Sequence, residues 1–427
     1  MPDLPAGEPV VTAADVDDAA ARLVGVVETT PLHRNQRLSA AYGCEVLLKR
    51  EDLQQVRSYK VRGAHNLILQ LDDEARSRGV VCASAGNHAQ GFAVACASLG
   101  VDGTVFVPAT TPRQKRERIA VLGGDRVVVR IVGDTYDDAS EAAVRHAADT
   151  GATLVHAFDD PRTVAGQGTV VAEAFAQLGR APDVVVVPVG GGGLLAGVVA
   201  WLAGHHPQVE VVAVEPGGAA SLAAALAAGG PVDLPEVDTF VDGAAVRRAG
   251  RTPYDVIAGA VPGSPPLTVV SVPEGRVCQE MLALYQSDGI IAEPAGALPT
   301  AALGHAWTPE PGAEVLCILS GGNNDVSRYA DVLERALLWE GRKHYFLVEF
   351  PQEPGALRRF LDDVLGPDDD ITLFEYVKRS NREVGPALVG IELGDPADLP
   401  ALLARMEAAP PKIERVPPDS PLFTFLV

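Results

Sequence analysis

Lysine is scarce in this chain, which holds six lysines against 29 arginines. Three of them, Lys49, Lys60 and Lys115, are the only lysines before residue 340. Arginine serves equally well as a surface charge, but it stays protonated and cannot form a Schiff base. A lysine retained in such a sequence is therefore a candidate for amine chemistry, and the first to consider lies in RSYKVRGA (57–64).

Further absences exclude several classes of protein. The 427 residues carry a formal net charge of −21, which would repel the phosphate backbone of a nucleic acid. No apolar stretch reaches the roughly 20 residues needed to span a bilayer, and the acidic N-terminus does not resemble a signal peptide. The five cysteines include no CxxC and no Cys/His pair at metal spacing, as expected of reduced, buried thiols. These features predict a cytoplasmic protein with neither a nucleic-acid nor a membrane partner.

Short β-branched runs alternate with alanine-rich amphipathic segments over the first three hundred residues. Runs that are apolar on both faces are typical of buried parallel strands. The alternation therefore predicts an open α/β architecture for a domain covering residues 1–327. The predicted strands are EVLLK (45–49), GVVCAS (79–84), GTVFVP (103–108), DRVVVRI (125–131), TLVHAF (153–158), VVVVPV (184–189), VEVVAVEP (209–216) and EVLCILS (314–320).

The pattern changes near residue 341. RYADVLERALLWEGRK (328–343) predicts a helix, and we assign residues 328–341 to a linker. Residues 342–427 then give strand, helix, two strands and helix, followed by FTFLV at the end. This order fits a small α+β regulatory module better than an extension of the large sheet.

The strongest local signal is PVGGGGLLAG (188–197), where four glycines follow a buried strand and precede a helix. Glycine lets the backbone approach an anion closely, and the free N–H groups at a helix start bind phosphate. The alternative is an ordinary strand-to-helix turn, which does not need four consecutive glycines. We therefore expect Gly190, Gly191, Gly192, Gly193 and Leu194 to form a phosphate-binding loop.

Two more loops follow predicted strands. SAGNHAQGFA (84–93) places Ser84, Asn87 and His88 at a helix start, where they could bind a carboxylate or a ring hydroxyl. In ILSGGNN (318–324), Ser320 ends a strand, the position at which open α/β sheets bind ligands. The alternatives are an N-cap with an Asx turn for the first loop and a plain turn for the second.

With the amine of Lys60, the three loops supply the groups that pyridoxal phosphate (PLP) requires: an amine, a phosphate loop, an amide for the ring oxygen and a hydroxyl for the ring nitrogen. From residue 30 to the C-terminus the chain resembles the biosynthetic threonine dehydratases (threonine ammonia-lyases), which are fold-type II PLP enzymes. Their fold has two open, mostly parallel α/β subdomains. The resemblance rests on five motifs in order: SYKVRGA (58–64), SAGNHAQG (84–91), VGGGGLLAG (189–197), EPAGA (293–297) and SGGNN (320–324).

The resemblance implies a role for each motif. Lys60 would hold PLP as a Schiff base and then act as the base that removes the Cα proton of threonine, giving 2-oxobutanoate and ammonia after loss of the β-hydroxyl. Asn87 would contact the ring oxygen, and Ser84, Asn87 and His88 the substrate. Ser320 would face the ring nitrogen with a neutral hydroxyl, which favours elimination over transamination. Lys49 is expected to be structural and Lys115 to have only a surface role.

Alternatives within the family differ at single positions. Serine racemase-like relatives have a serine where this chain has Ala85, which cannot return a proton, so racemisation is disfavoured. Their metal site lies around the strand that ends here at Glu215, but Ser221 stands in the place of an acidic ligand, and we predict no metal site. Tyr59 either packs near the PLP ring or belongs to the core. A general serine/threonine dehydratase and a non-catalytic amino-acid sensor complete the alternatives.

Residues 342–427 resemble the ACT-like regulatory domain of the same enzymes. The resemblance implies that isoleucine, the end product of the pathway, binds there as an inhibitor, with valine as an opposing effector. Only one such unit fits in this length, so we expect it to pair with its copy in a homodimer or homotetramer. L-Threonine is the expected substrate and L-serine a weaker one. The alternative is that the module serves only to dimerise the enzyme.

Overall fold

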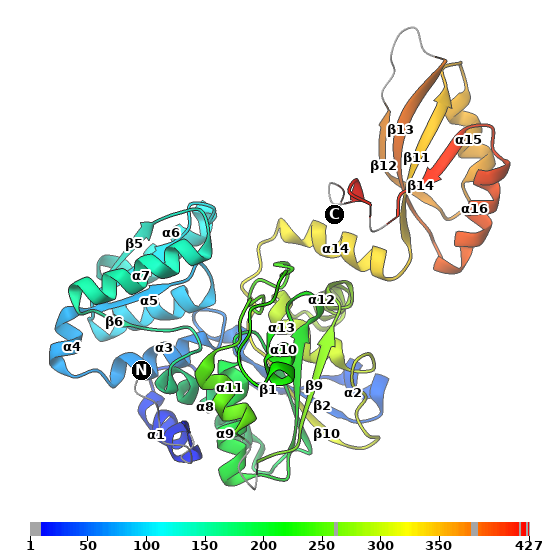
Figure 1. Cartoon of the computed structure of the whole chain (residues 1–427). Helices are drawn as coiled ribbons and strands as arrows, with labels where there is room; N and C mark the ends of the chain where they lie inside the picture. The colour runs from blue at the N-terminus through cyan, green and yellow to red at the C-terminus, as the bar shows by residue number, and fades with distance from the viewer. Residues whose placement is uncertain (1–9, 260–263, 377–382, 418–419, 424–425, 427) are drawn as a thin grey trace. The chain divides into compact units, whose positions relative to one another are not determined.

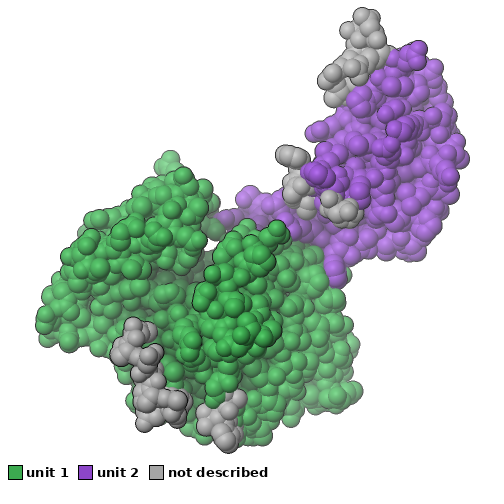
Figure 2. All heavy atoms as spheres, viewed as in Figure 1, with its two compact units in different colours: residues 1–324 green, residues 325–427 purple. Residues whose placement is uncertain are grey.

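The computed structural model describes residues 10–259, 264–376, 383–417, 420–423 and 426. The chain forms two compact units, residues 1–324 and residues 325–427, which are coloured separately in Figure 2. Among the described residues, no helix has both the length and the apolar character needed to cross a membrane. Each unit has a hydrophobic core of its own and is described by itself.

The larger sheet of the first unit has six strands, and every neighbouring pair except β1–β2 is parallel (Figure 1). All five residues of β7 are buried, as expected of a strand covered on both faces. In sheet order the strands are β1 (Leu32–Arg34), β2 (Glu45–Arg50), β10 (Glu314–Leu319), β7 (Val184–Pro188), β8 (Glu210–Pro216) and β9 (Leu267–Val272).

A second sheet of four parallel strands forms the other subdomain of this unit. Its core contains Val105, Val107 and Phe92, with Phe92 contributed by the helix that follows β3. In sheet order the strands are β5 (Val127–Ile131), β4 (Gly103–Val107), β3 (Val80–Ala83) and β6 (Thr153–Leu154).

Helices connect the parallel strands of both sheets, and several of them cross at glycines. A Cβ placed on Gly197 would lie 2.5 Å from the carbonyl oxygen of Val164, so α8 and α9 approach each other closely. The helices of the first unit are α1 (Ala13–Leu23), α2 (Gln36–Tyr42), α3 (Lys60–Leu69), α4 (Asp73–Arg78), α5 (Asn87–Leu99), α6 (Arg113–Gly123), α7 (Tyr136–Thr150), α8 (Pro161–Leu178), α9 (Gly193–His205), α10 (Ser221–Ala228), α11 (Arg251–Ala258), α12 (Glu274–Asp288) and α13 (Pro294–Ala302).

The second unit is a four-stranded antiparallel sheet in the order β12-β13-β11-β14. Phe346 and Val348 of β11 join residues of α15 and α16 in one core. Helix α14 is tied to β11 because Glu334 accepts hydrogen bonds from Lys343 and Tyr345. The elements are α14 (Arg328–Trp339), β11 (Lys343–Pro351), α15 (Ala356–Val364), β12 (Asp370–Tyr376), β13 (Val384–Glu392), α16 (Leu399–Ala408) and β14 (Lys412–Arg415).

The predicted fold class, an α/β protein with mostly parallel sheets and a small α+β unit, is confirmed. Two elements differ from the sequence-based expectation. The run 153–158 forms only the two-residue strand β6. Helix α14 ends at Trp339, since Gly341 takes a left-handed φ of 68° before β11 begins. The last strand of the described sheet is β14, and most of the FTFLV segment lies outside the described residues.

Candidate active site

Lys60 begins helix α3, and the backbone before it is fixed to the end of strand β10. The N–H group of Tyr59 donates to the Ser320 carbonyl at 3.1 Å, and Ser58 forms an antiparallel bridge with Gly321. The Lys60 amine lies 3.4 Å from the carbonyl oxygen of Ala157 and 5.3 Å from the centre of the Tyr59 ring. The half-buried lysine thus begins its helix beside the end of β10, a place at which open α/β sheets bind ligands.

A buried network of charges fixes the first turn of α3. Arg62 forms ion pairs of 2.7 Å with Glu51 and 3.0 Å with Glu173, and it is almost inaccessible to solvent. Lys49 is also fully buried and bonds to Glu173 and to the carbonyl of Thr30. Burial lowers the pKa of Lys49, and Glu173 opposes that shift. Removing one partner would leave an uncompensated buried charge, which is strongly destabilising.

The four-glycine segment lies between β7 and α9, as the sequence suggests. Gly192 has a φ of 91°, a left-handed conformation that favours glycine, and α9 begins at Gly193. A Cβ on Gly191 would lie 2.4 Å from the ring of Phe158, and one on Gly190 would lie 2.8 Å from the backbone of Ala244. No larger residue therefore fits in this segment without displacing its neighbours.

The second loop follows β3 and opens α5. Asn87 donates from Nδ2 to Glu293 at 2.6 Å and accepts at Oδ1 from Asn323 at 2.7 Å. The Ser84 hydroxyl accepts the N–H of Gly86 at 3.2 Å. His88 is buried, and its Nε2 lies 2.8 Å from the Val155 carbonyl. Burial, with the charge of Lys60, lowers the pKa of His88 to about 3, so its imidazole is neutral.

Ser320 follows β10 and is 2% exposed. Its carbonyl accepts from Tyr59, which places Ser320 beside the Lys60 backbone. The next residue, Gly321, accepts the N–H of Glu293 at 3.1 Å, and a Cβ on Gly321 would lie 2.3 Å from a Glu293 carboxylate oxygen. The backbone next to Lys60 thus contacts Ser320, the next residue Gly321 contacts Glu293, and Glu293 contacts Asn87.

The residues predicted to distinguish relatives are placed as follows. Tyr59 is half-buried against the main core and near the Lys60 amine, so both expectations for it stay open. Ala85 packs against the core of the smaller sheet. The Glu215 carboxylate accepts the N–H groups of Leu222 and Ala223 at 2.7 and 2.9 Å, which places it at the start of α10. No group of three or more potential metal ligands gathers among the described residues.

The residues of this site fit pyridoxal phosphate. The glycine segment permits close approach of an anion, and the first N–H groups of α9 have no partner within the helix. The Nδ1 atom of the buried His88 and the hydroxyl of the buried Ser58 have no hydrogen-bond partner among the described residues. Such buried, unpaired polar atoms beside an amine and a glycine loop are consistent with a site that is completed by a ligand.

Sequence reasoning did not assign a role to four residues of this site. Glu293 and Asn323 lie within the quoted motifs EPAGA and SGGNN, so their sequence neighbourhood was the available signal. Phe158 and Ala244 pack against the glycine segment from distant parts of the chain. Nothing in the sequence near Phe158 or Ala244 links them to residues 190–193.

Two family models match the chain. The model described as pyridoxal-phosphate dependent enzyme matches residues 24–321. The model described as the C-terminal regulatory domain of threonine dehydratase matches residues 334–426. The two matches follow one another along the sequence, with residues 322–333 between them, and together span most of it.

Individual relatives agree with these models. The chain is 60% identical over 417 residues to the biosynthetic L-threonine dehydratase IlvA of Mycobacterium tuberculosis, covering 98% of this chain and 96% of that protein. The processed threonine deaminase isoform 2 of Solanum lycopersicum has a similar structure, with a TM-score of 0.68 and 32% identity over 79% of this chain and 99% of that one. Maize serine racemase has a TM-score of 0.69 at 29% identity, over 77% and 99% of the two chains.

Proposed function

The chain belongs to the family of pyridoxal-phosphate dependent enzymes and carries the C-terminal regulatory domain of threonine dehydratase, and from this premise we propose that it is a threonine dehydratase. It converts L-threonine to 2-oxobutanoate and ammonia, the first step of isoleucine biosynthesis. The observation that carries the proposal is the grouping of the Lys60 amine, the glycine segment, Asn87 and Ser320 in a chain 60% identical to such an enzyme.

Each residue has a role that follows from its position. Bound PLP supplies an electron-withdrawing ring conjugated to the substrate Cα. The Lys60 amine, held near the Ala157 carbonyl, removes the Cα proton as a general base. The N–H groups of the glycine segment and the start of α9 bind the phosphate. In the overall reaction the Cα proton and the β-hydroxyl leave threonine as one water, and the released product would take up water to give 2-oxobutanoate and ammonia.

The neutral hydroxyl of Ser320 directs the reaction toward elimination. A carboxylate facing the ring nitrogen would hold a proton there and stabilise charge on the ring. A hydroxyl in that place would not hold a proton on the ring nitrogen, which would favour loss of the β-substituent over transamination. A general serine/threonine dehydratase remains the second candidate, because one methyl group provides only about 1–3 kcal/mol of discrimination. Equal kcat/KM values for threonine and serine would favour it.

Replacement of the proposed Schiff-base lysine tests the reaction. Lys60→Ala should abolish threonine turnover and leave no borohydride-reducible link between PLP and the protein. Lys115→Ala is the matched control, since Lys115 lies at the surface in an ion pair with Asp242. This variant should keep both threonine turnover and the reducible link to PLP. A reducible lysine adduct in Lys60→Ala would show that another lysine carries the cofactor.

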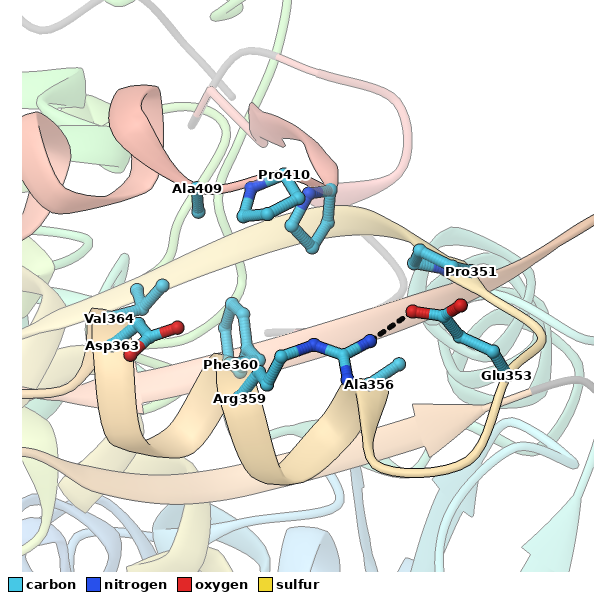
Figure 3. Close-up of a pocket in the computed structure, with 10 residues that line it drawn as sticks. Pro351, Glu353, Ala356, Arg359, Phe360, Asp363, Val364, Ala409 and Pro410 are labelled. Carbon is cyan, nitrogen blue, oxygen red and sulfur yellow. Dashed lines mark hydrogen bonds and ion pairs between the residues drawn. The ribbon is translucent and has the colours of Figure 1, made fainter.

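Isoleucine inhibition is the second part of the proposal. The second unit contains a cavity of about 140 Å³ at the end of β11, between α15 and residues 409–411 (Figure 3). Phe360, Val364 and Ala356 give it an apolar wall, while Arg359 and Asp363 place opposite charges at it. An α-amino acid with an apolar side chain carries complementary groups: a carboxylate for the guanidinium, an ammonium for the carboxylate and a branched chain for the wall.

Arg359 is paired with Glu353 across the turn after β11, and both side chains are about half exposed. Such an exposed ion pair contributes little to stability, so Arg359 can release Glu353 and bind the carboxylate of a ligand instead. We therefore place isoleucine, and valine as its competitor, in this cavity. Isoleucine should raise the apparent KM for threonine by a coupling factor of roughly 5–150-fold.

Two neighbouring arginines of α15 provide the test. Arg359→Gln removes the guanidinium proposed to bind the carboxylate of isoleucine. It should weaken isoleucine inhibition by roughly tenfold, the effect of one lost charged hydrogen bond. Arg358→Gln makes the same change at an exposed residue outside the cavity and should respond to isoleucine normally. Equal inhibition of the two variants would place the effector elsewhere.

We also propose a homodimer or homotetramer in the cytoplasm. The sheet of the second unit has α15 and α16 against one face, while Leu347 on the other face is 39% exposed. Pairing of that face with its copy would bury it. The five cysteines are free and buried, which suits a reducing compartment. Sedimentation equilibrium measures the oligomeric state, and a monomer would refute the pairing.

A further inference from the structure

A chain of three hydrogen bonds runs from the loop before Lys60 to a buried carboxyl group. Asn323 Nδ2 donates to the Val56 carbonyl at 2.7 Å and to Asn87 Oδ1 at 2.7 Å. Asn87 Nδ2 then donates to Glu293 at 2.6 Å. These contacts join segments 206 to 267 residues apart in the sequence.

The direction of this chain is determined by its first member. A backbone carbonyl can only accept, so Asn323 must present its Nδ2 to Val56. The same Nδ2 also donates to Asn87, so the acceptor on Asn87 must be its Oδ1. The Nδ2 of Asn87 is thereby turned toward Glu293, whose buried carboxyl oxygen accepts from it. Exchanging the amide and carbonyl ends of Asn87 would break its hydrogen bond with Asn323, because two Nδ2 groups would then face each other.

We infer that Asn323 and Glu293 are positioning residues that fix the Asn87 carboxamide with its Nδ2 available to the cofactor. The Asn87 Nδ2 carries two hydrogens. One of them is donated to Glu293, and the other remains for an acceptor such as a phenolate oxygen. The inference rests on the proposed function, in which Asn87 contacts the ring oxygen of PLP. Since Val56 lies four residues before Lys60, the same contacts couple the lysine loop to Asn87.

Reversing the polarity of one member tests the inference. Asn323→Asp has nearly the same shape but can only accept, so Asn87 must turn its Nδ2 toward Asp at 323 and present Oδ1 to the cofactor. The equilibrium Kd of PLP should rise by roughly tenfold or more, the effect of one lost hydrogen bond and one repulsive contact. The absorption maximum of the bound cofactor should shift as well.

A buried asparagine away from the site supplies the control. The Oδ1 of Asn35 accepts the N–H of Leu38 at the N-cap of α2, where aspartate caps as well as asparagine, so Asn35→Asp makes the same chemical change outside the chain of contacts. It should leave the PLP Kd and spectrum unchanged. Thermal unfolding of each variant separates a loss of folding from a loss of binding. Failure of the wild-type protein to bind PLP would refute the proposed function itself. Binding by the wild type together with an unaffected Asn323→Asp variant would refute only this inference.

Two further comparisons separate positioning from packing. If Asn323 only fills space, Asn323→Ala should weaken PLP binding more than the isosteric Asn323→Asp, whereas fixed polarity predicts the reverse order. At the other end, Glu293→Gln can still accept from Asn87 and should keep most of the affinity that Glu293→Leu loses. An Asn323→Asp protein that is folded, with the Kd and spectrum of Asn35→Asp, would overturn the inference.

Discussion

Glu293 combines deep burial with an ionisable carboxyl group. It is 4% exposed, and burial together with the charge of Asp242 raises its pKa to about 8 from an ordinary value of 4.5. The N–H donors of Asn87 and Asn323 and the charge of Lys60 oppose this rise but do not cancel it. The folded protein without cofactor therefore keeps a proton on Glu293 at neutral pH.

Linkage converts this pKa into a dependence of stability on pH. Because the folded state binds the proton more tightly than the unfolded state, the stabilising contribution is complete below pH 4.5 and is lost as the pH rises toward about 8. Urea unfolding of cofactor-free protein should show a free energy of unfolding that falls across this range. Glu293→Gln should flatten that part of the profile, and a variant with the wild-type slope would contradict the pKa shift.

Single residues of the site were predictable only where a motif marks them. The glycine segment and Ser320 each follow an apolar run that predicts a strand, so their place at a strand end could be inferred, whereas Lys60 was marked by the scarcity of lysine and by the SYKVRGA motif. The partnership of Asn87 with Glu293 could not, because it joins residues 206 positions apart. Such a contact depends on how α5 and α13 are arranged by two different sheets.

At the scale of elements, α5 controls where α3 begins. A Cβ on Gly91 would lie 2.9 Å from the backbone nitrogen of Val61 and 3.0 Å from the carbonyl carbon of Lys60. Gly91→Ala should therefore push the start of α3 away, cost about 1–3 kcal/mol of unfolding free energy by overpacking and weaken PLP binding. Both quantities are measured by denaturant unfolding and cofactor titration.

Gly230 is the matched position for this test, since a Cβ there meets no atom within 4 Å. Gly230→Ala should change the unfolding free energy by no more than about 1 kcal/mol. If Gly91→Ala behaves like this control, contact with α5 does not set the position of Lys60.

In the larger sheet, strand prediction succeeded where the strand is buried on both faces and missed the two edge strands. Strands β7 and β10 are almost wholly buried and read as continuous apolar runs. Strand β9 lies at one edge, is mostly half-buried or exposed, and contains Thr268 and Ser271. Strand β1 at the other edge has only three residues. An edge strand need not be apolar, so composition gives a weak signal there.

At the scale of the whole molecule, the division into two units suggests a separation of chemistry from regulation. The loop with Ser320 and Asn323 lies in the first unit, and α14 begins four residues after Asn324. Since Glu334 ties α14 to β11, and β11 ends at the proposed effector cavity, a short stretch of chain leads from that cavity to the site.

Removal of residues 325–427 tests that separation. The remaining unit keeps its own core and all proposed PLP contacts, so it should retain threonine turnover and lose its response to isoleucine. Initial rates at subsaturating threonine, with and without isoleucine, measure both. Full-length enzyme whose activity does not respond to millimolar isoleucine would refute feedback regulation. The alternative, that the second unit only dimerises the enzyme, would then be favoured.

Because the chain has few lysines, the acylation of each one can be followed separately and used to measure cofactor loading and unfolding. Lys49 is fully buried and ion-paired, so an N-hydroxysuccinimide ester reaches it only after unfolding. The side chains of Lys115 and Lys412, which are 29% and 62% exposed, stay reactive in the folded protein. A covalently bound cofactor would shield Lys60 between these extremes. Peptide mass spectrometry after a brief pulse of reagent would then read cofactor loading at one residue and global unfolding at another in the same sample.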